Sequence, residues 1–230
     1  MKECLIIFAK EPEKGRVKTR LQEYLGKKLC VNLYKAFLKD TVDLTDKITC
    51  EYKILAYDSR GKSPSYLKKI ASRYTFYKQK GDGLGERMHN AFRFAKYAGA
   101  SKMVIIGSDS PVLPALSINK AFDLLAGADL VLGPSLDGGY YLIGLKSPCA
   151  RLFKGIAWSS PAVFRDTIKK AKKLKKRTAL LNKRYDIDDK NSLLRLKNDL
   201  SKIKDRGVAR WTKKFMNSVS RLTDRNDKIV

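Results

Sequence analysis

The sequence has few of the residues that several common kinds of site require. It contains one histidine and four cysteines in 230 residues, and no two cysteines form a Cys-x-x-Cys pair. This argues against a zinc site and favours reduced thiols in a cytoplasmic protein. No segment approaches the roughly 20 apolar residues of a membrane-spanning helix, and the opening apolar run is too short for a signal peptide. We therefore expect a cytoplasmic protein.

Acidic residues are scarce relative to basic ones. The chain has 49 lysines and arginines against 23 acidic residues, which gives a formal net charge of +26. The excess is densest late in the chain, because residues 151–230 hold 24 basic and 8 acidic residues, whereas residues 1–150 hold 25 and 15. Such a charge predicts affinity for phosphates, nucleic acid or acidic membranes, and does not choose among them.

Short apolar runs alternate with segments of helical periodicity along the chain. Strands are predicted at about 4–9, 52–57 and 75–79, from 102 up to a polar turn at 107–111, and twice within 129–145. Helices are predicted at about 18–46, 63–74, 117–128, 160–177 and 191–203, with another one after the glycine-rich segment that begins at 81. Strands that are apolar throughout predict a mostly parallel sheet with helices on both faces. Ligands bind such sheets at the carboxyl ends of the strands.

The loop after the first apolar run is unusually cationic. Five basic side chains and one glycine lie within eleven residues, at Lys10, Lys14, Gly15, Arg16, Lys18 and Arg20. A strand that runs into a glycine-containing loop and then a helix is suited to binding phosphate, and arginine grips phosphate bidentately. The loop lacks the Gly-x4-Gly-Lys-[Ser/Thr] pattern of a Walker A motif. The alternative is a solvated cationic loop.

Two groups of carboxylates are candidate metal ligands. Asp109 follows the central apolar run, where it suits Mg²⁺ or Mn²⁺, although an aspartate there also suits a turn before Pro111. In "RYDIDD", Asp186 and Asp188 alternate and are expected to share one face of a strand. The alternative for this segment is a helix N-cap at Asp189 or Asn191.

Three further segments are candidates for contact with a substrate. In "QKGDGLGERM" the glycines permit close approach of a flat ligand, while Glu86 and Arg87 have the alternative of pairing with each other. In "SLDGGYY" Asp137 precedes two glycines, a pattern that an ordinary hairpin also explains. Trp158 is expected either in the core or in the wall of a substrate pocket.

Taken in order, these motifs resemble a known family of nucleotide-diphospho-sugar transferase-like proteins, DUF2064, also called selenodomain-associated glycosyltransferase-like proteins. The matching stretches are "FAKEPEKGRVKTRL", "QKGDGLGERM", "IGSDSPVLP", "LGPSLDGGYYLIGL", "IAWSSPAVFRDT" and "YDIDD", which together span about residues 5–189. More distantly, the sequence is similar to the phospholactate guanylyltransferase family. The resemblance implies a GT-A-like fold, a three-layer α/β/α sandwich around a mostly parallel sheet.

The resemblance also implies roles for individual residues. Nucleotide binding is implied for Lys10, Gly15, Arg16, Lys18, Arg20, Gln79, Gly83 and Gly85. Metal binding, of Mg²⁺ or Mn²⁺, is implied for Asp109 and Asp188, and an acceptor pocket for Asp137, Gly138, Gly139 and Trp158. Lys18, Arg20 and Asp137 are expected to be catalytic. The strand end carries one carboxylate, in Asp109-Ser110-Pro111, where glycosyltransferases usually have Asp-x-Asp.

We therefore expect a metal-dependent transferase that uses a nucleotide-activated sugar and a small-molecule or lipid acceptor. One alternative is a nucleotidyltransferase that joins a nucleoside triphosphate to a phosphorylated acceptor. Another is a non-catalytic protein that binds polyanions or a membrane surface, although specific binding of nucleic acid is not expected. Residues 1–204 are predicted to form one domain, and residues 205–230 a mobile basic tail that holds the protein at an anionic membrane surface.

Overall fold

The computed structural model describes residues 2–226, with side chains described through Val219. The chain forms two compact units, each built from three segments. The first unit comprises Met1–Glu11, Thr45–Gly107 and Pro114–Asp186, and the second comprises Pro12–Leu44, Ser108–Leu113 and Ile187–Val230. The described residues include no helix that is both long and apolar enough to cross a membrane.

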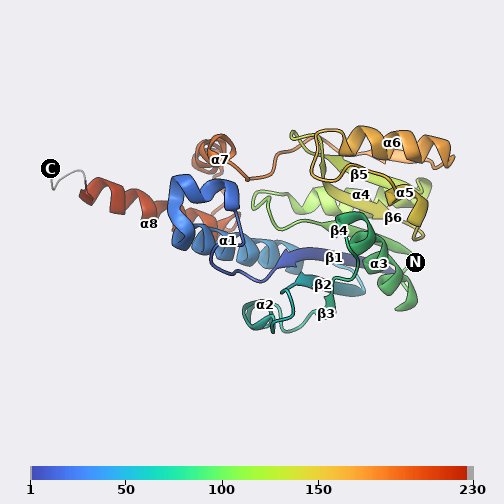
Figure 1. Cartoon of the computed structure of the whole chain (residues 1–230), viewed down its shortest axis with the longest axis horizontal. Coiled ribbons are helices and arrows are strands. Elements are labelled where there is room, and N and C mark those ends of the chain that lie inside the picture. Colours follow the sequence, from blue (N-terminus) through green and yellow to red (C-terminus); the bar gives the residue numbers. More distant parts are fainter. Residues whose placement is uncertain (1, 227–230) are drawn as a thin grey trace. The chain divides into compact units, whose positions relative to one another are not determined.

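A seven-stranded sheet forms the centre of the first unit (Figure 1). Its strands are β1 (Glu3–Lys10), β2 (Tyr52–Asp58), β3 (Thr75–Lys78), β4 (Lys102–Ile106), β5 (Leu130–Pro134), β6 (Tyr140–Leu145) and β7 (Thr178–Leu180). They lie in the order β3-β2-β1-β4-β6-β5-β7, and only β6 runs antiparallel to its neighbours. The predicted mostly parallel sheet is confirmed.

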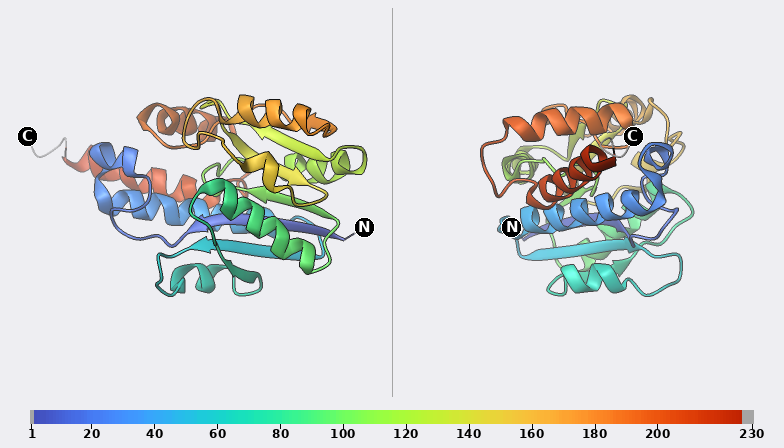
Figure 2. Two further views of the ribbon diagram at one scale, coloured as in Figure 1. Left: turned by 45° about the vertical axis from the view of Figure 1, so that its right-hand side comes forward. Right: turned by 90° about the vertical axis from the view of Figure 1, so that its left-hand side faces the viewer.

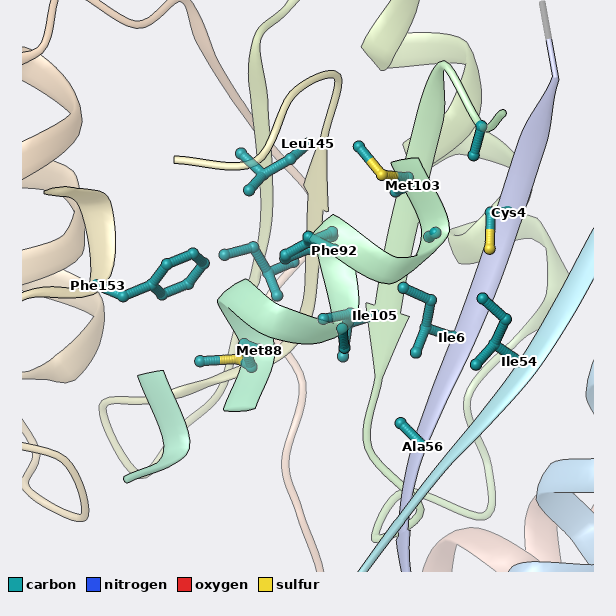
Figure 3. Packing of buried hydrophobic residues seen from close by; sticks show 14 of the residues in the cluster. Cys4, Ile6, Ile54, Ala56, Met88, Phe92, Met103, Ile105, Leu145 and Phe153 are labelled. Atoms are coloured by element: carbon teal, nitrogen blue, oxygen red, sulfur yellow. The ribbon is translucent and has the colours of Figure 1, made fainter. Parts of the chain in front are cut away.

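Helices cover both faces of this sheet. The helices of the first unit are α2 (Ser65–Ile70), α3 (Leu84–Tyr97), α4 (Ala115–Gly127), α5 (Ala150–Phe153) and α6 (Val163–Lys173). Alternate residues of β4 point to opposite faces. Ile105 packs in a buried cluster with Phe92 of α3 and Phe153 of α5 (Figure 3). In Figure 2, α3 is the green helix that crosses in front of the strands in the left-hand view.

The opposite face of the sheet is covered by α4. A Cβ atom added at Gly144 of β6 would lie 3.1 Å from Leu125 of α4 and 3.4 Å from Val104 of β4. Val104 is therefore on the face that Ile105 does not share. The first unit is thus a three-layer α/β/α sandwich, which confirms the expected GT-A-like class.

The second unit is helical in the residues that the structure describes. It contains the short 3₁₀ helix η1 (Thr19–Leu21), α7 (Lys190–Lys202), α8 (Arg210–Asn226) and all but the end of α1 (Gln22–Asp46). Gly26 interrupts α1 with a positive φ of 75°. The buried residues of α7 are Leu193, Leu196 and Leu200, at the spacing of one helical face.

Most predicted elements are found within a few residues of their expected bounds, and one prediction is wrong. Residues 186–188 belong to no strand, so Asp186 and Asp188 do not share a strand face. Residues 205–230 were expected to be a basic tail, and most of this segment is occupied by α8. The amino end of α8 is bonded to Asp40 of α1, whose carboxylate accepts hydrogen bonds from the backbone of Trp211 and Thr212 and from the Thr212 hydroxyl.

Candidate functional site

Lys18 is the most unusual residue of the cationic loop. Its exposed fraction is only 8%, although a lysine is almost never fully buried unless it is paired. Its backbone lies in the left-handed region, with φ 49° and ψ 46°, immediately before η1. A non-glycine residue there costs on the order of 1–3 kcal/mol, and such conformations cluster at functional sites. Lys18 is therefore both buried and held in a strained backbone conformation, which makes its surroundings a candidate functional site.

Three oxygen atoms surround the ammonium group of Lys18. Lys18 Nζ donates to the backbone oxygen of Ile187 at 2.5 Å and to Asp188 Oδ1 at 3.0 Å, and it lies 2.5 Å from Asp109 Oδ1. The ring of Phe37 lies on another side, 5.3 Å from Nζ to the ring centroid. All of these residues belong to the second unit. Two of the predicted metal ligands therefore meet at the predicted phosphate-binding lysine.

Local hydrogen bonds hold the two aspartates in place. The backbone N–H of Ile187 donates to the backbone oxygen of Asp109 at 3.1 Å, which ties the two segments together beside Lys18. Asp188 then precedes α7, where Asp189 is the N-cap and forms a capping box with Ser192. The predicted N-cap at Asp189 is confirmed. Because a capped helix begins directly after Asp188, the position of this carboxylate is fixed by its own chain.

The charges in this cluster keep Lys18 protonated. Burial by itself would lower the pKa of Lys18, but the carboxylates of Asp109 and Asp188 outweigh burial and raise the pKa above its ordinary value. The side chains of Asp109 and Asp188 are 43% and 46% exposed, so their outer sides face solvent. The cluster therefore consists of a buried ammonium group and two carboxylates that are partly exposed at the surface.

The carboxylates beside Lys18 are the residues from which the implied divalent metal would take its ligands. Among the described residues, no group of three or more histidine, cysteine, aspartate or glutamate side chains is placed to hold a metal ion. Mg²⁺ commonly takes one or two carboxylates and completes its shell with water and substrate phosphates. Asp109 and Asp188 fit that pattern, because each touches Lys18 through one oxygen and both side chains remain nearly half exposed.

The other basic side chains of the loop make different contacts from those of Lys18. Arg16 forms an ion pair with Glu13 at 2.7 Å, and the intervening Gly15 has a positive φ of 82°. Arg20 is exposed in η1 and is one of the groups that lower the pKa of Asp189. Only Lys18 of these residues turns inward. Lys18 is thus buried, whereas the neighbouring Arg20 is exposed.

The predicted nucleotide-binding residues after β3 lie in the first unit, as does the exposed Lys10 at the end of β1. The side chain of Gln79 donates to the backbone oxygen of Ala56 at 2.8 Å, and Gly83 is the N-cap of α3. A Cβ atom at Gly85 would lie 2.6 Å from the ring of Trp158. Trp158 therefore packs on Gly85, and it is also stacked on Phe153.

Arg87 has a role that sequence reasoning missed. It pairs with Asp58 at the end of β2 at 3.0 Å, and its Nε donates to the backbone oxygen of Gly81 at 3.1 Å. The suggested pairing of Arg87 with Glu86 is wrong, because Glu86 accepts from the backbone N–H of Asp82 instead. Arg87 therefore anchors the glycine-rich loop. The sequence offers no local signal for this pairing, because Arg87 and Asp58 are 29 residues apart.

The predicted acceptor residues form a tight turn in the first unit. Asp137 Oδ1 accepts from the backbone N–H of Gly139 at 3.0 Å, and Asp137 is exposed. Gly138 has a positive φ of 89°, and a Cβ atom there would overlap the backbone of Pro161. Phe164 N donates to the oxygen of Gly138 at 2.8 Å. Gly138 is therefore required by the packing of this turn, whereas a Cβ atom at Gly139 would meet the side chain of Asp137 at 3.3 Å.

Comparison with known proteins identifies the family. Residues 41–160 match a family described as an uncharacterized protein conserved in bacteria, DUF2064. The crystal structure of a proposed nucleotide-diphospho-sugar transferase from Desulfovibrio desulfuricans G20 is 30% identical, covers 98% of each chain and superposes with a TM-score of 0.89. The chain belongs to the DUF2064 family. The resemblance inferred from the sequence motifs is thus confirmed. No curated protein matches the chain.

More distant structures share the fold of this DUF2064 protein. The inositol-1-phosphate CTP transferase from T. maritima is 14% identical over 94% of this chain and 96% of its own, with a TM-score of 0.56. Rv0371c from Mycobacterium tuberculosis, solved in complex with manganese, is 13% identical over 85% of this chain and 98% of its own, with a TM-score of 0.51. At these identities the similarity concerns the fold alone. The Desulfovibrio desulfuricans G20 protein and the inositol-1-phosphate CTP transferase are both transferases by name, in agreement with the expected transferase class.

Proposed function

We propose that this DUF2064 protein is a metal-dependent transferase whose donor is a nucleotide-activated sugar, and that Lys18, Asp109 and Asp188 hold the donor's diphosphate end. The observation that carries the proposal is the position of Lys18 Nζ, within 3.0 Å of an oxygen of each aspartate. A purely structural ion pair needs one carboxylate. A second one, with both side chains nearly half exposed, leaves anionic oxygens directed at solvent beside a cationic loop.

Each group of the cluster has a separate task in this proposal. Lys18 holds one oxygen of Asp109 and one of Asp188, so the two carboxylates are fixed before a ligand arrives. Asp109 and Asp188 would hold Mg²⁺ or Mn²⁺, and the ion would neutralise the diphosphate. Arg20, which is exposed in η1, would bind the phosphates.

The transfer itself breaks the bond between the sugar's anomeric carbon and the diphosphate oxygen, which keeps the electron pair. The acceptor's oxygen forms the new bond to that carbon and loses its proton. The charge that develops on the leaving nucleoside diphosphate would be stabilised by the exposed Arg20, a contact worth on the order of 3 kcal/mol of barrier lowering. Lys18, whose three N–H groups face Ile187, Asp109 and Asp188, would act through the carboxylates that it holds. Asp137, which is expected to be catalytic, would orient the acceptor hydroxyl or take its proton, and this role stays a prediction.

A second candidate is nucleotidyl transfer, in which a phosphorylated acceptor attacks a nucleoside triphosphate and releases pyrophosphate. One sequence feature favours it: the strand end carries a single carboxylate in Asp109-Ser110-Pro111, not Asp-x-Asp. Fold neighbours such as the inositol-1-phosphate CTP transferase support it further. The released product distinguishes the two reactions, since sugar transfer yields a nucleoside diphosphate.

The test is a thermal-shift panel of nucleoside diphosphates, triphosphates and nucleotide-sugars, with and without Mn²⁺. A ligand at 100 times its dissociation constant adds about 2.7 kcal/mol to the free energy of unfolding. We expect one nucleotide class to stabilise the wild type with Mn²⁺, and the shift to vanish after chelation and in Asp109→Ala. Asp123→Ala, an exposed aspartate of α4, is the matched control. A wild type that no nucleotide stabilises would contradict the proposal.

A further inference from the structure

The turn between α7 and α8 forms a second cationic site in the second unit, and the proposed transfer reaction does not use it. A groove of about 480 Å³ lies beside this turn and the first half of α8. It is lined by Ile203, Lys204, Arg206, Arg210, Lys213, Lys214, Asn217 and Ser218. Five of these eight side chains are cationic and only one is apolar. The lining therefore suits an anion and gives an apolar ligand little to contact.

The cations of this groove differ in how far they are neutralised. Arg210 pairs with Asp43 of α1 at 2.7 Å. Lys204, Arg206 and Lys214 are exposed, and among the described residues no ion pair to any of them is found. Segment 202–214 contains six basic residues and a single acidic one, Asp205. The groove therefore keeps a surplus of positive charge.

The shape of the groove is fixed by bonds inside the turn. Lys213 Nζ donates to the backbone oxygens of Ile203 at 3.1 Å and Asp205 at 2.9 Å, which ties α8 to the turn. The carboxylate of Asp205 accepts from the backbone N–H of Gly207 at 2.7 Å, so it is folded onto its own loop. Asp40 occupies backbone N–H groups at the start of α8. An anion in the groove must therefore be held by the side chains.

The geometry points to a binding site for a phosphate group that carries two or more negative charges, with Lys204, Arg206 and Lys214 as its principal contacts. Several unpaired cations around one groove favour a multivalent anion, because each charge-assisted hydrogen bond is strong when donor and acceptor are ionised. The volume exceeds that of a single phosphate and lies within the range of ordinary ligand pockets. The phosphate belongs either to a free phosphorylated compound or to a lipid headgroup.

Titration calorimetry with inorganic tripolyphosphate, without divalent metal, tests the site on the full chain. We expect Lys204→Ala/Lys214→Ala to weaken binding about tenfold or more, since each loses a charge-assisted contact. Lys169→Ala/Lys172→Ala removes the same charge from exposed positions of α6 and is expected to bind like the wild type. Asp109→Ala should also bind like the wild type, which separates this site from the proposed reaction.

Sedimentation with phosphatidylcholine vesicles, with and without phosphatidic acid, distinguishes the sources. Wild type that sediments only with phosphatidic acid, and is released by Lys204→Ala/Lys214→Ala, identifies a lipid headgroup. Binding of tripolyphosphate without binding of vesicles identifies a free phosphorylated compound. The proposal is overturned if the groove variant matches the α6 control in both assays, if wild type binds neither probe, or if the variant loses only binding to an RNA oligonucleotide.

Discussion

The second unit holds two cationic regions. They look alike in the sequence, but the structure buries the cation of one region and exposes the cations of the other. In the cluster at Lys18, one ammonium group is buried and two carboxylates surround it. In the groove beside α8, several cations are exposed, and within the part of the chain that the structure describes only Arg210 among them pairs with a carboxylate. Each region contains lysine and arginine within a short stretch of chain, so charge density does not separate them.

The difference shows that the same residue type serves two purposes. The buried ammonium group of Lys18 holds Asp109 and Asp188 in place, and the carboxylate oxygens of these two residues are exposed at the surface. At Lys204 and Lys214 the positive charge itself is what the surface presents. A metal ion with its phosphates suits the first region, and a bare multivalent anion suits the second.

The strongest test of this comparison removes both carboxylates from Lys18. Asp109→Asn/Asp188→Asn leaves a buried ammonium group without counter-charge, and we expect a loss of about 3 kcal/mol in the free energy of unfolding. This is the low end of the range for buried pairs, because both aspartates are partly exposed. Urea denaturation measures it. Adding Lys18→Met should restore most of the stability, whereas a triple variant no more stable than the double one would contradict this account of Lys18.

A second test concerns the attachment of α8. Asp40 is buried and accepts from two backbone N–H groups and the hydroxyl of Thr212. Asp40→Ala leaves these donors unsatisfied, and we expect a loss of about 2 kcal/mol together with weaker tripolyphosphate binding in the groove. Asp43→Ala removes an exposed ion pair with Arg210 and a partly buried hydrogen bond from Trp211 Nε1, and it should cost less because these contacts are more exposed. Urea denaturation measures both losses, and a loss in Asp40→Ala no larger than that in Asp43→Ala would contradict the larger role of Asp40.

Acidification should change the Asp40 contact in a defined direction. Burial raises the pKa of Asp40 above its ordinary value, although the hydrogen bonds from Thr212 and Trp211 oppose it. A carboxyl whose folded-state pKa is raised contributes most stability below its unfolded pKa and loses that contribution as the pH rises through the folded pKa. The stability of the wild type relative to Asp40→Asn should therefore increase as the pH falls through the carboxyl range. A difference that shrinks on acidification would contradict this direction.

The smallest expected effect is at the capping box beside Asp188. Asp189→Ala removes the N-cap of α7 and should cost about 1 kcal/mol, with Lys197→Ala on the exposed side of α7 as the control. Hydrogen bonds from Ser192 lower the pKa of Asp189. Its contribution is therefore complete above the unfolded pKa and disappears as the pH falls through the folded pKa. Stability curves of both variants from pH 7 into the acid range measure this, and a constant difference would contradict it.

The predictable parts of the fold are those that depend on residues adjacent in sequence. The apolar strands and the N-cap at Asp189 follow from residues adjacent in sequence, and both were found. Strand β7, with only three residues, carries too little periodicity to be recognised beside the run of lysines that precedes it. Helix α8 escaped notice because its many charged residues obscure the spacing of Trp211, Phe215 and Val219.

The sequence predicted which residues form the candidate site, but it did not predict how they are arranged. Lys18, Asp109 and Asp188 were each recognised by residue type and by position relative to an apolar run. That Lys18 turns inward depends on a hydrogen bond across 170 residues, which no local pattern encodes. The sequence offers Glu86, its neighbour, as an alternative partner for Arg87, which instead pairs with Asp58 across 29 residues.

The long separation between Lys18 and Asp188 has a consequence for the order of events during synthesis. Domains fold as the chain is made from its amino end. The loop around Lys18 leaves the ribosome before Asp109 and Asp188 do, so its ammonium group acquires Asp109 later and Asp188 only after a further stretch of chain, 170 residues beyond Lys18, has been made. Asp40 likewise waits for Trp211 and Thr212. The cluster at Lys18 is thus completed only after Asp188 has been made, so a chain that terminates before Asp188 cannot present the assembled cluster.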